Sequence, residues 1–373
     1  MITVREVDNK RDLRRFVDFP NKLYKDVEQY IPAMYGEELE DFDKCKNPAF
    51  EYCEAKCFLA YNNSGEIVGR IAGILNENAN KKWERRRMRF SHLDFIDDEE
   101  VSAALFKAVE AYAREKNCEQ VHGPLGFCDL DREGMLVEGF EQRSMFITYY
   151  NHPYYMRHME RLGYAKDTDW VEYLLTVPEE PNDKLSRLAD IVMRKNKLHI
   201  ADIRKKRLIK PYVRGVFELL NKAYENLYGV VPLSPRQVEK YTNKFLPIVN
   251  YRYVCIVLDQ NEEVVAFGVA APSIGPALKK SGGRLFPLGA VRVLKALRKN
   301  DTLDLFLVAV KPELQGAGLN AIVMDYVVKN AIKYGIRRAE TGPELETNDK
   351  VQAQWRFFET QRHKRRRCYI KSI

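Results

Sequence analysis

The amino-acid sequence predicts a mixed α/β protein built from two tandem modules, each with a mixed central sheet flanked by helices. The chain has 373 residues, more than one typical domain, and its 45% hydrophobic residues can fill two cores. The same order of strands and helices recurs in both halves. Because a polar stretch with two prolines, residues 178–183, separates the halves, we expect modules over residues 1–178 and 184–373.

In the N-terminal module, strand-like alternation over residues 2–7 precedes a helix that Asp8 can cap and that Pro20 should interrupt. A hairpin, a strand, an amphipathic helix with apolar residues at helical spacing, and a short strand then follow. A further helix and strand complete the module. The expected ranges after the first helix are 56–61 with 66–76, 89–95, 99–116, 119–122, 151–162 and 164–177.

The second half repeats this order. We expect helices at 208–227 and 235–245, a hairpin at 252–258 and 263–271, and a strand at 303–310. A helix at 319–334, a strand at 337–341, a helix at 348–361 and a basic strand at 365–373 follow. The hairpins match when residue 57 is aligned with residue 254, an offset of 197 residues, and both fifth strands end in Gly-Pro. The alternative is chance agreement between ordinary α/β patterns.

Composition narrows the class of protein. The seven cysteines are an odd number and include no C-x-x-C pair, which is typical of free thiols in a reducing cytosol. A charge within the first five residues argues against a signal peptide. The longest apolar runs have the length of strands, whereas a membrane-spanning helix needs about 20 apolar residues. Six scattered histidines lack ligand spacing. We therefore expect a cytoplasmic protein with free thiols, no transmembrane segment and no metal site.

The segment from Leu307 to Asn320 carries the clearest chemical signal. A predicted strand runs into a loop with Gly316 and Gly318 and then directly into a long amphipathic helix. A helix N-terminus presents unpaired backbone N–H groups and a dipole that favours an anion. Glycine lets a phosphate approach the backbone closely, and no acidic residue occurs between Glu313 and Asp325. The alternative is a plain strand-to-helix turn.

This loop resembles the pyrophosphate loop of the GNAT (Gcn5-related N-acetyltransferase) superfamily, Val-x-Pro-x-x-(Arg/Gln)-Gly-x-Gly-x-(Gly/Ala). The residues that fit are Val310, Pro312, Gln315, Gly316 and Gly318, whereas Asn320 stands where the family has Gly or Ala. The whole chain resembles a bacterial group of tandem GNAT-like proteins. In the N-terminal module, the matching site at residues 95–101 has no glycine and four consecutive acids. Acids there would repel a diphosphate, so we expect no CoA in that module.

The resemblance implies an N-acyltransferase that uses acetyl-CoA or another acyl-CoA as donor for an amine acceptor. The implied donor-binding residues are Val308, Ala309, Val310, Gln315, Gly316, Ala317, Gly318, Leu319, Asn320 and Asn348. Asn348 can alternatively cap its own helix. Glu340 and Asp304 are the candidate acid–base residues, and surface carboxylates are the equal alternative. Trp355 stands where the family's proton-donating Tyr is expected, and an indole cannot supply that proton.

Two basic segments are candidate contacts for anionic partners. Residues 272–300 carry seven basic residues and no acid, and Val291, Leu294 and Leu297 share a helical face. Such a helix suits an anionic surface, an acidic carrier protein or a nucleic-acid backbone, or it packs on its own module. Residues 362–367 form a basic run that an edge strand explains equally well. The first hypothesis is acylation of a small or lipid-linked amine. The alternatives are CoA binding without turnover, or association with RNA or tRNA.

Overall fold

The computed structural model describes all 373 residues and divides the chain into two compact units. Unit 1 consists of Met1–Val171, Gly275–Arg292 and Lys364–Ile373, and unit 2 consists of Glu172–Ile274 and Val293–His363. This division differs from the contiguous one expected at residues 178 and 184. Part of the basic segment and the C-terminal end of the chain belong to unit 1.

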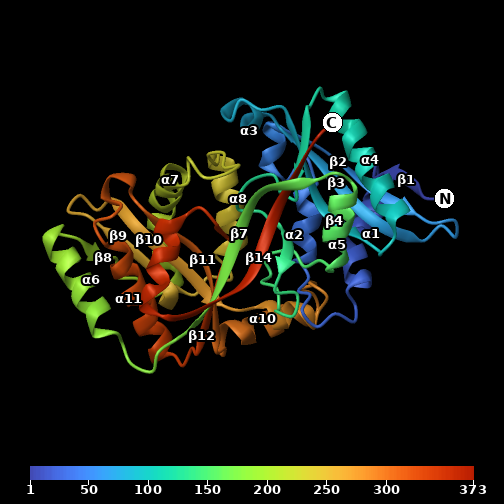
Figure 1. Cartoon of the computed structure of the whole chain (residues 1–373). Helices are drawn as coiled ribbons and strands as arrows, with labels where there is room; N and C mark the ends of the chain where they lie inside the picture. The colour runs from blue at the N-terminus through green and yellow to red at the C-terminus, as the bar shows by residue number, and fades with distance from the viewer. The chain divides into compact units, whose positions relative to one another are not determined.

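Unit 1 contains a mixed sheet with the strand order β1-β2-β3-β4-β5-β14 (Figure 1). Neighbouring strands in this order are antiparallel except for β4 and β5, which run parallel. The short strand β6 pairs with β14. The strands are β1 (Thr3–Glu6), β2 (Cys53–Tyr61), β3 (Ile67–Asn76), β4 (Arg87–Phe95), β5 (Gln120–Gly123), β6 (Met135–Glu138) and β14 (Glu359–Ser372), which belongs to unit 1 from Lys364 onward.

The two faces of this sheet are covered by different helices. Phe58 and Ala60 of β2 lie in one core with residues of α4, whereas Leu59 lies in another core with Phe16 of α1. Since successive residues of a strand face opposite sides, α4 and α1 cover opposite faces. The helices of this part of the chain are α1 (Lys10–Leu23), α2 (Tyr35–Asp41), α3 (Glu77–Lys82), α4 (Glu99–Glu115) and α5 (Tyr154–Arg161).

Unit 2 repeats the plan with the strand order β8-β9-β10-β11-β12-β7. Here β11 and β12 form the parallel pair, as β4 and β5 do in unit 1. The strands are β8 (His199–Ile200), β9 (Val254–Leu258), β10 (Val264–Pro272), β11 (Thr302–Val310), β12 (Arg338–Thr341) and β7 (Ala165–Thr176), with β13 (Glu344–Leu345) pairing β7. The helices are α6 (Asp183–Lys195), α7 (Val213–Ala223), α8 (Pro235–Phe245), α11 (Leu319–Lys333) and α12 (Asp349–Gln352). The basic insertion contributes α9 (Gly275–Lys279) and α10 (Gly289–Arg298).

The faces of the unit 2 sheet also differ in what covers them. Leu303 and Val310 of β11 lie in cores that contain residues of α11 and α6. On the other face, α7 contacts β10 and β11, and the ring of Phe245 from α8 lies 6.2 Å from the ring of Phe306. Asp304, next to Leu303 in the strand, therefore faces away from α11.

Each sheet ends in a strand from a distant part of the sequence. Leu174 and its neighbours in β7 pair with β12 of unit 2, although β7 begins within unit 1, which extends to Val171. Conversely, Tyr369 and its neighbours in β14 pair with β5 of unit 1. Local periodicity identifies a strand but does not determine which strand it pairs with. This is why the sequence placed residues 164–177 wholly in the first module.

Several expected helix limits are wrong. The helix expected over 208–227 is only α7, which follows a 3-10 segment at Lys206–Tyr212. Helix α1 is capped by Asn9 instead of Asp8, and it continues through Pro20 to Leu23. A proline lacks the N–H that would bond the carbonyl four residues earlier, and the carbonyl of Phe16 instead accepts a hydrogen bond of 2.9 Å from Arg70. The helix expected over 348–361 is only α12 followed by a 3-10 turn at Ala353–Phe357, because β14 already begins at Glu359.

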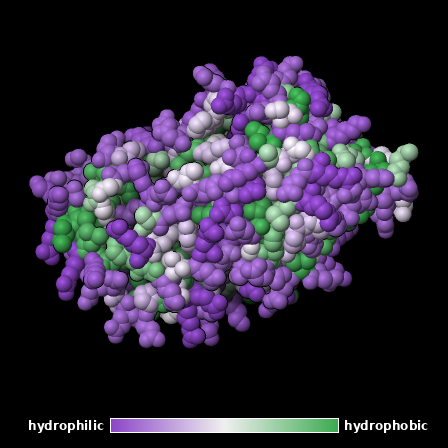
Figure 2. Space-filling view, in the orientation of Figure 1, coloured by the Kyte–Doolittle hydropathy of each residue, from purple (hydrophilic) through white to green (hydrophobic).

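The surface is mostly polar, as expected when the hydrophobic residues are buried in two cores. The face in Figure 2 is mostly hydrophilic, and its hydrophobic residues gather in small separate patches. All seven cysteines are free thiols, of which only Cys45 is exposed. None of the helices combines the length and hydrophobicity that crossing a bilayer requires.

Candidate functional site

The loop between β11 and α11 leaves the first amides of α11 open. Gly316 and Gly318 have φ angles of 82° and 87°, in the left-handed region that favours glycine. Gly318 is the N-cap, no side chain caps the helix, and its first turn contains no acid. Gln315, Gly316 and Ala317 are exposed. An anion can therefore reach N–H groups that have no partner within the helix.

The strand before this loop has an unpaired edge. Strand β11 pairs with β12 only from Thr302 to Leu305, and the last contact is the amide of Gly342 on the carbonyl of Leu305 at 3.0 Å. The remainder of β11, through Val310, has no strand partner on that side. The amide of Lys311 donates to Val265 of β10. Backbone groups alternate along a strand, so those of Val308 and Val310 point away from β10.

Tyr224, at the C-terminal end of α7, reaches this edge. Its hydroxyl donates to the carbonyl of Val308 at 3.1 Å. No pattern in the sequence distinguishes this residue from the other tyrosines, of which the chain has 21 in total. The structure thus places a phenol beside the free edge of β11, whereas the sequence had identified no proton donor because Trp355 stands at the family's Tyr position.

Four titratable side chains lie together on the face of the sheet opposite α11. Asp304 and Glu340 are direct neighbours across β11 and β12. Glu340 lies 3.5 Å from Nε2 of His363, and the ligand-capable atoms of Glu340, His363 and Glu172 all lie within 4.8 Å of one another. Asp304 is 1% exposed and Glu172 is fully buried, whereas Glu340 is partly accessible. This acid–base cluster can accept and relay a proton.

Both predicted carboxylates belong to the acid–base cluster, but the sequence missed its other two members. Glu172 had a signal that could have found it, since it is a lone acid within the apolar run from Trp170 to Leu175. His363 had none, because it lies inside a basic run that was interpreted as a surface feature. That run is in fact strand β14, in which Lys364 and Arg366 are buried.

Asn348 and Trp355 have local roles in unit 2. Asn348 caps α12 by accepting from the amide of Val351 at 3.4 Å, while its contact with a donor stays a prediction. Trp355 is buried, and its indole N–H lies 3.1 Å from each carboxylate oxygen of Glu344. Burial raises the pKa of Glu344 to about 8, although the hydrogen bond from Trp355 opposes this rise. Glu344 was not among the residues predicted from the sequence.

The matching helix start in unit 1 is already filled by side chains. Asp98 caps α4 by accepting from the amides of Glu100 and Val101. Asp97 pairs with Arg157 at 2.6 Å and with His158 at 2.8 Å. The acids thus satisfy the N–H groups that an anion would need, and Arg157 of α5 neutralises Asp97.

Unit 1 also has a counterpart of the acid–base cluster. His122 of β5 lies close to Asp167 and Cys368, with their ligand-capable atoms within 4.8 Å. Burial lowers the pKa of His122 to about 4, despite a hydrogen bond with Asp167 that opposes the change. The imidazole and the thiol are buried, whereas Asp167 is partly accessible and pairs with Arg87 at 3.2 Å.

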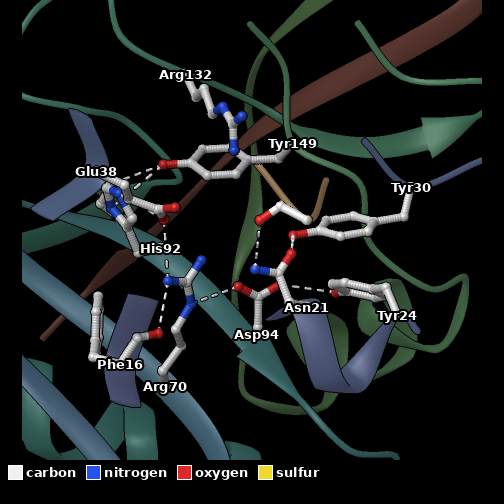
Figure 3. Close-up of polar contacts among 12 residues, drawn as sticks. Phe16, Asn21, Tyr24, Tyr30, Glu38, Arg70, His92, Asp94, Arg132 and Tyr149 are labelled. Atoms are coloured by element: carbon white, nitrogen blue, oxygen red, sulfur yellow. Dashed lines mark hydrogen bonds and ion pairs between the residues drawn. The ribbon is translucent and has the colours of Figure 1, made fainter. Parts of the chain in front are cut away.

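A second polar network of unit 1 is buried around Arg70 (Figure 3). Its guanidinium donates to Asp94 at 2.7 Å and to Glu38 at 3.1 Å, and the hydroxyl of Tyr24 donates to Asp94 at 2.9 Å. Burial raises the pKa of Asp94, against the opposing effect of Arg70. Tyr155 is fully buried and stacks on Phe95. Each charge in this network has a partner, which is how a core tolerates buried ions.

Comparison with known proteins identifies the fold. No family model matches the chain. It is 27% identical to protein YghO of Escherichia coli strain K12, over 99% of this chain and 95% of that protein. It is 24% identical to a bacterial ceramide synthase of Caulobacter vibrioides, over 93% of this chain and 91% of that protein.

Two solved structures share the architecture. A tandem GNAT protein from the clavulanic acid biosynthesis pathway matches 100% of this chain and 98% of its own, with a TM-score of 0.58 and 10% identity. A GCN5-related N-acetyltransferase from Sphaerobacter thermophilus matches 100% of this chain and 95% of its own, with a TM-score of 0.52 and 11% identity. The chain therefore has the tandem GNAT fold, and the predicted fold class is confirmed.

Proposed function

Since the chain has the tandem GNAT fold, we propose that it is an acyl-CoA-dependent N-acyltransferase with one donor site, in unit 2. The observation that carries the proposal is the uncapped N-terminus of α11, with left-handed Gly316 and Gly318 and no acid in its first turn. In this proposal the loop from Gln315 to Asn320 binds the pyrophosphate of the donor through its remaining amides, since those of Gln315 and Ala317 donate to the carbonyls of Pro312 and Leu314. The acid-capped start of α4 supports a single site.

The free edge of β11 is the proposed place for the rest of the donor. An acyl-CoA extended from the pyrophosphate site can pair with the backbone groups of Val308 and Val310, as an added strand would. The amide of Val310 is then available to polarise the thioester carbonyl. This assignment gives Val308, Ala309 and Val310 the roles that the resemblance implied for them.

Glu340 is the proposed acceptor of the amine proton. An amine must lose a proton to attack a thioester, and a carboxylate within reach can take it. His363, 3.5 Å from Glu340, can relay that proton. Glu172 and Asp304 add acidic groups that favour an ammonium ion in the site. The amine nitrogen then bonds to the thioester carbon, the C–S bond breaks, and the thiolate takes a proton, for which Tyr224 is the nearest hydroxyl to Val308.

The proposed acceptor is the primary amine of a long-chain amino alcohol. This choice rests on the relative named a ceramide synthase, which covers 93% of this chain, because a ceramide is an amide of such an amine. The alternative is a protein that binds CoA without turnover. Trp355 favours it, since the family's proton donor is absent from that position and the indole is bound to Glu344.

The test combines an acyl-CoA with sphinganine and follows amide and free CoA by mass spectrometry. We expect amide formation by the parent and a loss of about 100-fold or more in kcat for Glu340→Gln, with acyl-CoA binding retained. Glu359→Gln, an exposed carboxyl in the same unit, is the matched control and should keep full turnover. Acyl-CoA binding without any amide product would support the alternative. Full turnover by Glu340→Gln would remove Glu340 from the mechanism.

A further inference from the structure

The segment around α10 exposes large hydrophobic side chains. Of the eleven large hydrophobic residues that are exposed in the chain, five lie between residues 285 and 294. They are Leu285, Phe286, Leu288, Val291 and Leu294, and Phe286 is 89% exposed. Isolated exposed hydrophobic residues are ordinary on a protein surface, but a concentration within one segment marks a site of interaction.

Helix α10 turns hydrophobic residues toward solvent. Val293 is buried at 6% exposure and fixes the inward side of the helix. Val291 and Leu294 are 63% and 54% exposed, and at 100° per residue they lie on the opposite side together with Arg298. The sequence had placed Val291 and Leu294 on a face that could pack on the module. The structure leaves this face open.

The charge of the segment has one sign. Residues 272–300 contain seven basic residues and no acid. Arg284 pairs with Asp18 at 2.7 Å, and Arg292 donates to the carbonyl of Lys280. Lys295 and Arg298 are exposed and make no ion pair. Their charge is therefore available to an anionic partner.

The stretch before α10 is fixed to unit 1. Lys279 donates to the carbonyl of Val27 at 2.6 Å, and the amide of Tyr35 donates to the carbonyl of Gly283 at 3.0 Å. Gly283 lies so close to the chain that a Cβ there would sit 1.9 Å from the carbonyl oxygen of Ala33. The exposed residues that follow are thus presented from a fixed base, which lowers the entropy lost when they bind.

We propose that residues 285–299 form a docking surface for an anionic lipid bilayer. A bilayer interface accepts both features at once, since aliphatic and aromatic side chains enter the acyl boundary while Lys and Arg meet anionic headgroups. A nucleic-acid backbone offers charge but no partner for exposed Phe286, Val291 and Leu294. The charge complementarity and the outward hydrophobic residues together favour the bilayer. The docking surface goes beyond the proposed acyl transfer and holds whether or not the chain turns over acyl-CoA.

Vesicle sedimentation tests the docking surface with the full chain. The parent should bind vesicles of equimolar phosphatidylcholine and phosphatidylglycerol and should bind vesicles of phosphatidylcholine alone at least tenfold more weakly. Each basic residue near an anionic bilayer contributes about fivefold to partitioning, from about 1 kcal/mol. The double variant Lys295→Gln/Arg298→Gln should therefore bind roughly 25-fold more weakly, and Phe286→Ser/Leu294→Ser should also lose binding.

A matched control comes from α6 in unit 2. Ile191→Ser/Lys195→Gln changes a hydrophobic residue that is 61% exposed and a lysine in another helix, and it should bind vesicles like the parent. All substituted positions in α6 and α10 are accessible, and thermal melting of each variant is the test that it is folded. A second readout is Phe286→Trp, whose fluorescence should shift to the blue on anionic vesicles.

Three results would overturn the docking surface. The first is a parent chain that binds neither kind of vesicle, whether or not it binds RNA. The second is anionic binding that survives Phe286→Ser/Leu294→Ser, which would indicate charge alone and favour an acidic protein partner. The third is equal loss of binding in the α6 control, because the effect would then not belong to residues 285–299.

Discussion

The substitution Glu344→Gln tests the polar core of unit 2 through the pH dependence of stability. Burial raises the pKa of Glu344 from its ordinary value of 4.5 to about 8. Between these values the folded chain holds a proton that the unfolded chain has already released. The contribution of Glu344 to stability is therefore complete below pH 4.5 and is lost as the pH rises through about 8.

The size of the effect follows from the interval between the two pKa values. Each pH unit corresponds to about 1.4 kcal/mol, so the interval from 4.5 to about 8 gives an upper limit of about 5 kcal/mol at alkaline pH. Glutamine stays neutral at every pH, and its carbonyl oxygen can still accept the hydrogen bond from Trp355. The variant should therefore gain stability over the parent as the pH rises.

Urea denaturation from about pH 5 to about pH 9 measures this difference. Other buried acids, such as Glu133, whose pKa burial raises to about 8, affect parent and variant equally and cancel. Glu359→Gln, at an exposed carboxyl, is the control and should leave the difference flat. A constant difference between the parent and Glu344→Gln across the whole range would refute the buried, protonated state of Glu344.

Further predictions concern unit 1. Arg70→Met should lower the free energy of unfolding by about 3–5 kcal/mol, because it leaves Asp94 buried without its cation. Arg15→Met, which breaks an accessible pair with Asp12, should cost less than about 1 kcal/mol by the same urea titration. Equal losses in the two variants would contradict this account. Asp98→Ala should cost about 1 kcal/mol through the lost helix cap, and calorimetry should still give at most one acyl-CoA per chain. A second equivalent would show that unit 1 also binds the donor.

Much of the fold could be predicted because local patterns determine it. The hairpins and the helices α4 and α11 follow from periodicity and turn residues within short windows. The loop before α11 needs two residues with positive φ, and the glycines at positions 316 and 318 predict this conformation from the sequence. The acids at the start of α4 likewise predicted that side chains would accept hydrogen bonds from the first helical amides, and Asp98 does so.

The remainder depends on distant partners that no local pattern contains. The sequence could not tell that β7 joins β12 or that β14 joins β5, since pairing is set by the whole sheet. For the same reason His363 could not be linked to Glu340. Helix α10 shows a different limit. Its hydrophobic spacing predicted the helix, but the burial of Val293 instead of Val291 became visible only with its neighbours in place.

Calorimetric titration of the chain with acyl-CoA is the most direct test of the donor site. We expect the parent to bind one equivalent and Gly316→Glu to lose binding, because the variant places a carboxylate at the start of α11. Gly335→Glu is the matched control, because Gly335 ends the same helix with a φ of 74° and open space around it, as at Gly316. It should bind like the parent. Undiminished binding by Gly316→Glu, or no binding by the parent, would contradict a donor site at Gln315–Asn320.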